Sequence, residues 1–150
     1  MEHEIYNQDS GFKKVLKELI ENDINFKVKT RNKSRHKHII SDIGSFYLLY
    51  KREYFNTFGK QFKSTEFTSG ESINKDALLY CFRNKVKLLI FIHKTEVKCV
   101  SPEFFYKIAL KNKWIRRQER SNLYSEGIIH EKTYSIPKEY LVDYKLKLLY

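Results

Sequence analysis

The sequence of 150 residues has little cysteine, proline or glycine, and no long apolar run. Its two cysteines, Cys81 and Cys99, lack the spacing of a four-ligand zinc site, so we expect both to be small core residues. Two prolines and five glycines leave little room for flexible linkers, which indicates a single ordered domain over residues 1–150. No segment approaches the ~20 apolar residues of a membrane helix, and the acidic start does not resemble a signal peptide. We therefore expect a cytoplasmic protein with no membrane partner.

Motifs of several enzyme classes are missing as well. There is no phosphate-cradling Gly-rich loop, nucleophile elbow or metalloprotease motif, so nucleotide hydrolysis and acyl chemistry have no support. Positive charge, by contrast, is in excess, because 29 Lys and Arg residues against 18 Asp and Glu give a net charge of +11. A domain this basic usually binds a polyanion, most often nucleic acid. The alternative is that lysines on solvated faces only keep the protein soluble.

Hydrophobic patterning predicts an α/β fold. Residues 88–92 are five apolar residues in a row, which is typical of a strand covered on both faces. A helix at 74–86 precedes this strand, and an alternating strand at 96–101 follows it. The other expected elements are a first helix capped at Asp9 or Ser10 and ending at Asn22–Asp23, strands at 26–29, 39–40 and 46–50 with a turn at 41–45, a helix starting at Ser101-Pro102-Glu103, a short hairpin within 122–136 and a last helix from Pro137.

Basic residues occupy every second position from residue 27 to residue 37, with no acid between them. If this segment is extended, all of them share one face and repeat about every 6.6 Å, which suits contact with a phosphate backbone. Alternatively, residues 30–35 form a polar hairpin tip, where that period has no meaning. A second basic cluster follows Trp114. The predicted nucleic-acid-binding residues are Lys27, Lys29, Arg31, Lys33, Arg35, Lys37, Arg116, Arg117 and Arg120.

Residues 54–72 read as a long loop that mixes aromatic residues with basic ones. Long loops in compact domains are often functional, and Phe55, Phe58 and Phe62 are candidates for stacking on unpaired bases. The alternative is that these aromatic residues close the edge of the sheet as a minor core.

The predicted order of helix, three-strand meander, helix, two strands and helix (αβββαββα) resembles the PD-(D/E)XK nuclease superfamily, most of all the small archaeal Holliday junction resolvases. The closest likeness runs from Ile73-Asn74-Lys75-Asp76 through the buried strand to Ser101-Pro102-Glu103-Phe104-Phe105. The resemblance implies a restriction-endonuclease-like core, in which a central mixed β-sheet is flanked by helices. It also implies phosphodiester cleavage with a divalent metal, Mg or Mn, which polarises the phosphate and activates a water.

In that family the metal is held by an Asp that opens one hairpin strand and by the Glu of a Glu-x-Lys on the next. Asp42 and Lys51 match these positions, but Leu49 stands where the Glu is expected, and the nearest acid is Glu53 in the reversed order Lys-x-Glu. On a strand Lys51 and Glu53 still share a face. For Asp42 the alternative is ordinary turn chemistry. The resemblance thus implies Asp42, Lys51, Glu53 and Glu71 as catalytic residues, with Asp42, Glu53 and the migrated Glu71 as metal ligands.

A second resemblance is to the catalytic domain of tRNA splicing endonucleases. That domain also runs helix, strand hairpin, helix, strand, strand, and it cleaves RNA without metal through a Tyr, a His and a Lys. Candidates in comparable places are His36 or His38 and Lys85 or Lys87, whereas no Tyr is assigned. His93 and His130 stand alone in the sequence, which is typical of structural histidines.

Three functions are therefore expected. The first is a metal-dependent endonuclease that cleaves DNA, including branched DNA. The second is a DNA- or RNA-binding module with a degenerate nuclease fold, which the missing Glu-x-Lys favours. The third is metal-independent cleavage of RNA. The partner in each case is nucleic acid, DNA before RNA, and the apolar face of the last predicted helix also suits a homodimer.

Overall fold

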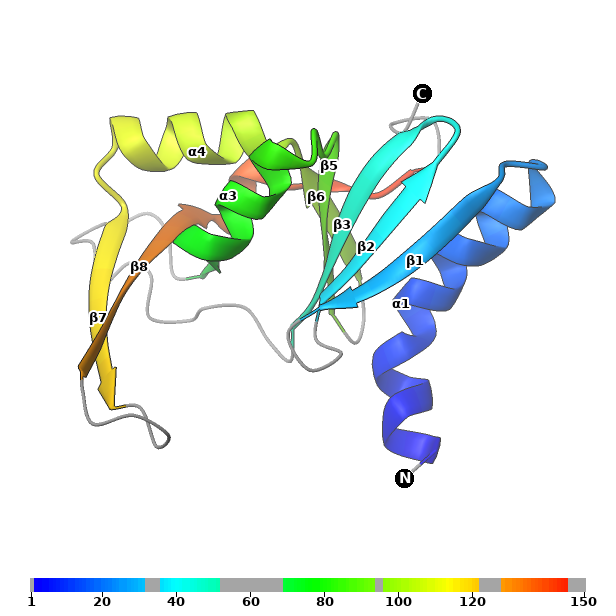
Figure 1. Cartoon of the computed structure of the whole chain (residues 1–150), viewed down its shortest axis with the longest axis horizontal. Coiled ribbons are helices and arrows are strands. Elements are labelled where there is room, and N and C mark those ends of the chain that lie inside the picture. Colours follow the sequence, from blue (N-terminus) through cyan, green and yellow to red (C-terminus); the bar gives the residue numbers. More distant parts are fainter. Residues whose placement is uncertain (1, 32–35, 52–68, 94–95, 122–127, 146–150) are drawn as a thin grey trace.

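A computed structural model of the chain describes residues 2–31, 36–51, 69–93, 96–121 and 128–145, with the backbone alone at 2–10, 118–121 and 128–131. The protein has a mixed α/β fold with helices and two sheets (Figure 1). The larger sheet has six strands in the order β1-β2-β3-β5-β6-β9, and the smaller has three in the order β4-β8-β7. The predicted α/β class with a mixed central sheet is thus confirmed.

The six-stranded sheet starts with an antiparallel meander of β1 (Phe26–Arg31), β2 (His36–Ser41) and β3 (Gly44–Tyr50). β3 pairs in parallel with β5 (Leu88–Ile92), which is followed by antiparallel β6 (Val97–Val100) and β9 (Val142–Asp143). All five residues of β5 are buried. This confirms the prediction that the apolar run forms a strand covered on both faces.

Helices cover both faces of this sheet. Because successive side chains of a strand point to opposite faces, Phe46 of β3 packs in a core with α1 (Glu2–Glu21), while Tyr47 packs in a core with α3 (Lys75–Arg83) and α4 (Pro102–Lys111). Among the described residues, no helix is long and apolar enough to cross a membrane.

The starts of α3 and α4 follow from their predicted caps. The side chain of Asn74 accepts a hydrogen bond from the Ala77 N–H at 2.8 Å, and the Ser101 hydroxyl accepts one from the Phe104 N–H at 3.1 Å. Both predictions are confirmed. The first helix, however, begins at Glu2 and not at Asp9 or Ser10. Acidic residues at a helix start interact favourably with the helix dipole, and no proline interrupts residues 2–21.

The smaller sheet consists of β4 (Gly70–Asn74), β8 (Ile128–Pro137) and β7 (Ile115–Ser121). The predicted hairpin is therefore longer than residues 122–136. The loop prediction for 54–72 is wrong at 70–72, which belong to β4, and its aromatic residues lie outside the described residues. β4 was missed because its inward face carries a buried acid, Glu71, which conceals the alternation expected of a half-buried strand.

The last predicted helix is wrong for residues 137–145. The 3-10 helix η1 (Lys138–Tyr140) is followed by β9, which pairs with β6, and the Tyr144 N–H donates to the Val97 carbonyl at 2.9 Å. The open edge of β6 thus satisfies these backbone groups without a helix. The apolar helix face on which the expected homodimer depended is accordingly not present in these residues.

We predict that Gly11→Ala destabilises the protein, because the new Cβ would lie 2.5 Å from Cγ2 of Ile92 and 3.0 Å from Cγ2 of Val97. Overpacking of a core costs about 1–3 kcal/mol, which exceeds the gain of about 1 kcal/mol from placing Ala in a helix. Urea denaturation should show a lower midpoint than the wild type, whereas Lys14→Ala on the exposed face should not. An unchanged midpoint for Gly11→Ala would contradict the close contact of α1 with β5.

Candidate functional site

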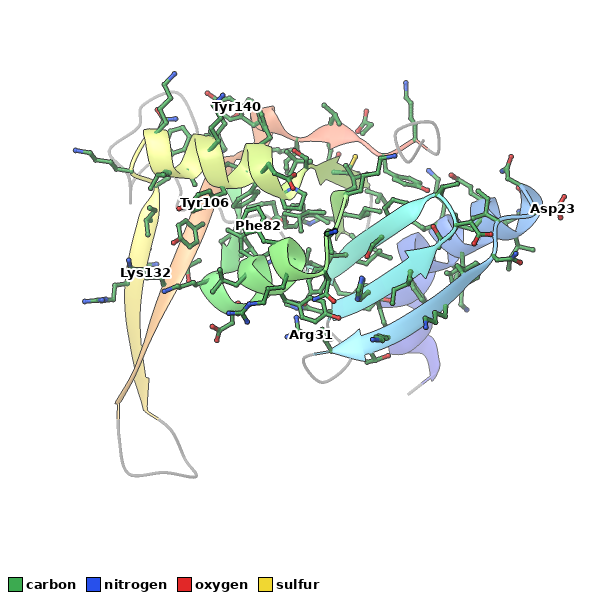
Figure 2. The ribbon with its side chains drawn as sticks, turned by 45° about the horizontal axis from the view of Figure 1, so that its top comes forward. Asp23, Arg31, Phe82, Tyr106, Lys132 and Tyr140 are labelled. Carbon is green, nitrogen blue, oxygen red and sulfur yellow. The ribbon has the colours of Figure 1, made fainter. Side chains whose placement is uncertain are left out.

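Two of the groups of polar side chains in the described residues are candidate sites. The Arg31 cluster, on the face of the six-stranded sheet that α3 covers, consists of Arg31, His36, His38, Ser45, Tyr47 and Tyr80. The Lys51 cluster lies where β3 and β5 end and consists of Lys51, Glu71 and His93. Figure 2 shows Arg31 beside α3, at the end of β1.

The register of the meander builds the Arg31 cluster. Arg31 lies opposite His36, and Lys29 lies opposite His38, which in turn lies opposite Tyr47. Directly opposite residues of antiparallel strands share a face, so these two rows of side chains all point toward α3. Residues that are distant in the sequence therefore meet, although each strand alone gives no sign of it.

The hydroxyl of Tyr47 connects Arg31 to His36. It accepts a hydrogen bond from Nη1 of Arg31 at 3.0 Å and lies 2.5 Å from Nδ1 of His36. A guanidinium only donates hydrogen bonds, so the Tyr47 oxygen accepts from Arg31. Between Tyr47 and His36 the direction follows the tautomer of His36: the hydroxyl donates when the ring proton is on Nε2 and accepts when it is on Nδ1. Burial raises the pKa of Tyr47 to about 12, so the hydroxyl remains protonated near neutral pH.

His38 is bound on both sides. Its Nδ1 lies 2.7 Å from the Tyr80 hydroxyl, and its Nε2 forms a hydrogen bond with the Ser45 hydroxyl. Burial lowers the pKa of His38, and the charges of Lys29 and Arg31 lower it further. His38 is therefore neutral at neutral pH and holds Tyr80, which supports Arg31.

Arg31 lies over an aromatic ring, with its guanidinium carbon 3.6 Å from the ring centroid of Tyr80. No carboxylate in the described part of the chain forms an ion pair with it. Lys27 and Lys29 are exposed on the same face of β1. This region thus holds positive charge that the described residues do not neutralise, and it can bind an anion.

The Lys51 cluster follows from the parallel pairing of β3 with β5. Tyr50 lies opposite Ile92, so the next residues, Lys51 and His93, leave the sheet side by side. Ligands often bind at the carboxyl ends of strands in α/β sheets. Glu71 reaches this point from β4, with Oε2 3.3 Å from Nε2 of His93.

Two of the three groups, Glu71 and His93, are buried, and Lys51 is half-buried. Glu71 is 2% exposed and His93 is 6% exposed. Nζ of Lys51 donates to the Ser72 carbonyl at 2.9 Å, and burial lowers the Lys51 pKa although the charge of Glu71 opposes the shift. Such groups can stabilise charge or transfer a proton. They can equally act as a buried ion pair that joins the two sheets.

The predicted site residues come together only in part. Lys51 lies near Glu71, because its Nζ donates to the carbonyl of the next residue, Ser72, and the charge of Glu71 acts on it. Asp42 does not join them, because it is exposed in the turn between β2 and β3. The seven residues of β3 place it roughly 23 Å from Lys51 at about 3.3 Å per residue. Its place agrees with the turn alternative, and Glu53 lies outside the described residues.

Sequence reasoning missed His93 and Tyr47. For His93 the sequence did hold a signal, which is its position directly after the buried strand. No local signal exists for Tyr47, because its role arises from pairing between strands. Metal-independent RNA cleavage was predicted to use His36 or His38, Lys85 or Lys87, and an unassigned Tyr. In the structure Tyr47 contacts His36 and Tyr80 contacts His38, while the backbone of Lys87 lies beside Ser45.

The basic residues do not form the single face predicted from their alternation. Lys27, Lys29 and Arg31 face α3, but Lys37 lies on the opposite face, where its Nζ is 3.0 Å from Thr30 Oγ1 and 5.8 Å from the Phe12 ring centroid. The prediction is wrong because residues 26–31 and 36–41 are two separate strands that pair antiparallel, with Arg31 opposite His36. Most of the hairpin tip predicted as the alternative lies outside the described residues. Lys33 and Arg35 lie outside the described residues.

The second basic cluster lies apart from the first. Arg116 and Arg117 belong to β7, as does the backbone of Arg120, and Figure 1 shows α3 between β7 and the end of β1. The described residues of the two regions belong to different sheets. The two regions must be considered as separate anion-binding candidates.

No known protein family, curated protein or solved structure matches this chain significantly. The two clusters are consequently the observations on which a function can be proposed. They differ in access and charge. The Arg31 cluster is half-buried and cationic, whereas the Lys51 cluster is largely buried and contains its own carboxylate.

We predict that His38 makes folding stability depend on pH. Its pKa in the folded protein is lowered from 6.5, so between these two values the unfolded chain binds a proton that the folded chain does not. Stability should then fall as the pH drops below about 6.5, by at most about 1.4 kcal/mol per pH unit. In urea denaturation between about pH 5 and about pH 7.5, His38→Gln should weaken this dependence. Equal pH dependence in both proteins would contradict the assignment to His38.

Proposed function

We propose that this protein binds nucleic acid through the side of β1 that carries Lys27, Lys29 and Arg31. The observation that carries the proposal is the unneutralised charge of the Arg31 cluster, since no described carboxylate pairs with Arg31. Phosphate contacts from lysine and arginine supply most of the affinity in non-specific nucleic acid binding. DNA is the first polymer to test, with RNA second.

The proposal includes a restriction-endonuclease-like core. It is supported by the sequence of elements α1, β1–β2–β3, α3, β5, β6 and α4, which is the order that the resemblance implies. The parallel addition of β5 to the meander makes the central sheet mixed, with helices on both faces. β4 and the β7–β8 hairpin are additions to that order.

Binding of fluorescently labelled single-stranded, duplex and branched DNA, and of RNA, should weaken steeply as salt rises. Lys27→Ala and Lys29→Ala should each lower the affinity and reduce the slope of log K against log salt by about 0.7–0.9, the value for one lost phosphate contact. Lys107→Ala removes an equal charge from an exposed position in α4 and should have little effect. Salt-independent binding, or equal losses for all three variants, would refute the proposed surface.

A second candidate function is phosphodiester cleavage by the Lys51 cluster. It is favoured by the convergence of Lys51, Glu71 and His93 at the carboxyl ends of β3 and β5. Lys51 would stabilise negative charge on the phosphate, and the Glu71–His93 pair would take a proton from the attacking water and return it to the leaving oxygen as the phosphodiester bond breaks. The described residues hold no group of three His, Cys, Asp or Glu suited to a metal ion, and the expected ligand Glu53 lies outside them, so Mg or Mn stays a prediction.

Cleavage should be assayed on the same nucleic acids with magnesium, with manganese and with a chelator. Glu71→Gln keeps the size of the side chain but removes its charge, and it should slow cleavage by at least about 100-fold without changing nucleic acid affinity. Asp42→Ala is the control and should cleave normally, because Asp42 is remote from the cluster. Absence of cleavage in the wild type, or full activity of Glu71→Gln, rejects this second function.

A further inference from the structure

The Arg31 side chain is held in place before any ligand arrives. Arginine side chains usually lose about 2 kcal/mol of rotamer entropy when they are fixed. Here the Tyr47 hydroxyl accepts from Nη1 at 3.0 Å, and the Tyr80 ring lies 3.6 Å from the guanidinium carbon. The side chain is half-buried between the end of β1 and α3. Much of the cost of ordering it is therefore met by folding.

The two tyrosines that hold Arg31 are themselves oriented. The Tyr47 hydroxyl forms a hydrogen bond with Nδ1 of His36, which in either direction leaves an oxygen lone pair for the guanidinium. The Tyr80 hydroxyl is bound to His38, and the two rings meet edge to face at 5.3 Å. This arrangement resembles the layered support found behind binding residues, in which second-layer hydrogen bonds lock the contacting group.

Among the described residues, nothing in the packing of the fold accounts for this fixed cation. An arginine that serves the fold usually pairs with a carboxylate, but the described residues provide none for Arg31. Lys29 adds further positive charge nearby, since its charge and that of Arg31 both act on His38. An anion would complete the cluster. A planar guanidinium donates two parallel hydrogen bonds to phosphate, which an ammonium cannot do.

We propose that Arg31 is a fixed phosphate-binding residue, which Tyr47 and Tyr80 hold so that its guanidinium binds one backbone phosphate of a nucleic acid strand through paired hydrogen bonds. Lys27 and Lys29 then act as diffuse charge around this one positioned contact. The inference rests on the proposed nucleic acid function, which supplies the phosphate. It adds that affinity depends on the geometry of one guanidinium and not only on net charge.

The test uses charge-conserving variants of the full chain and a labelled oligonucleotide. Arg31→Lys keeps the charge but removes the paired donors, and Tyr47→Phe removes the hydroxyl that holds the guanidinium. Each should weaken binding about 10-fold, the size expected for a charge-assisted hydrogen bond, with an unchanged salt slope. The matched controls, Lys107→Arg in α4 and Tyr140→Phe, lie outside the proposed surface and should bind as the wild type does. If Tyr47→Phe does not fold, Tyr80→Leu removes the supporting ring and tests the same support.

Inorganic phosphate distinguishes recognition of the group from general screening. At equal ionic strength, phosphate should displace a larger fraction of the oligonucleotide from the wild type than chloride does. This difference should vanish in Arg31→Lys. Wild-type affinity in Arg31→Lys, or equal displacement by both anions, overturns the inference while the proposed function stands. Lack of any salt-dependent binding by the wild type overturns both.

Discussion

The parallel pairing of β3 with β5 is the constraint on which the arrangement of both clusters depends. It places β3 inside the sheet, so that its alternate side chains enter two different cores, Phe46 toward α1 and Tyr47 toward α3. It also aligns the ends of the two strands, which brings Lys51 beside His93. A shift of one residue in this register would exchange the two cores and remove Tyr47 from the α3 side.

The two clusters place charge in different ways. In the Lys51 cluster a carboxylate lies beside His93 and near Lys51, so the charge of Lys51 has a partner and the cluster can serve stability as well as chemistry. In the Arg31 cluster the polar partners are hydroxyls and neutral histidine, which fix the guanidinium without neutralising it. A fixed and unneutralised cation is suited to a ligand that brings its own negative charge. The proposed nucleic acid surface depends on this difference.

Local signals allowed much of the fold to be predicted, and nonlocal pairing explains what was missed. A few neighbouring residues suffice to recognise the helix caps at Asn74 and Ser101 and the buried strand at 88–92. Glu71 was named from the sequence, but its contact with His93 depends on β4, whose buried acid hides the strand. The alternation of basic residues was likewise a poor guide, because β1 and β2 are separate antiparallel strands. No spacing rule predicts which residues share a face across two strands.

NMR of the arginine side chains tests the central claim most directly, because the Nε–Hε signal of each arginine reports its own hydrogen bonds. A titration with a short oligonucleotide is predicted to shift the Arg31 signal in proportion to the bound fraction, and Arg31→Lys identifies that signal. If only the signals of Arg116 and Arg117 shift, while that of Arg31 is unchanged at saturation, the account of the Arg31 cluster as the nucleic acid contact is contradicted.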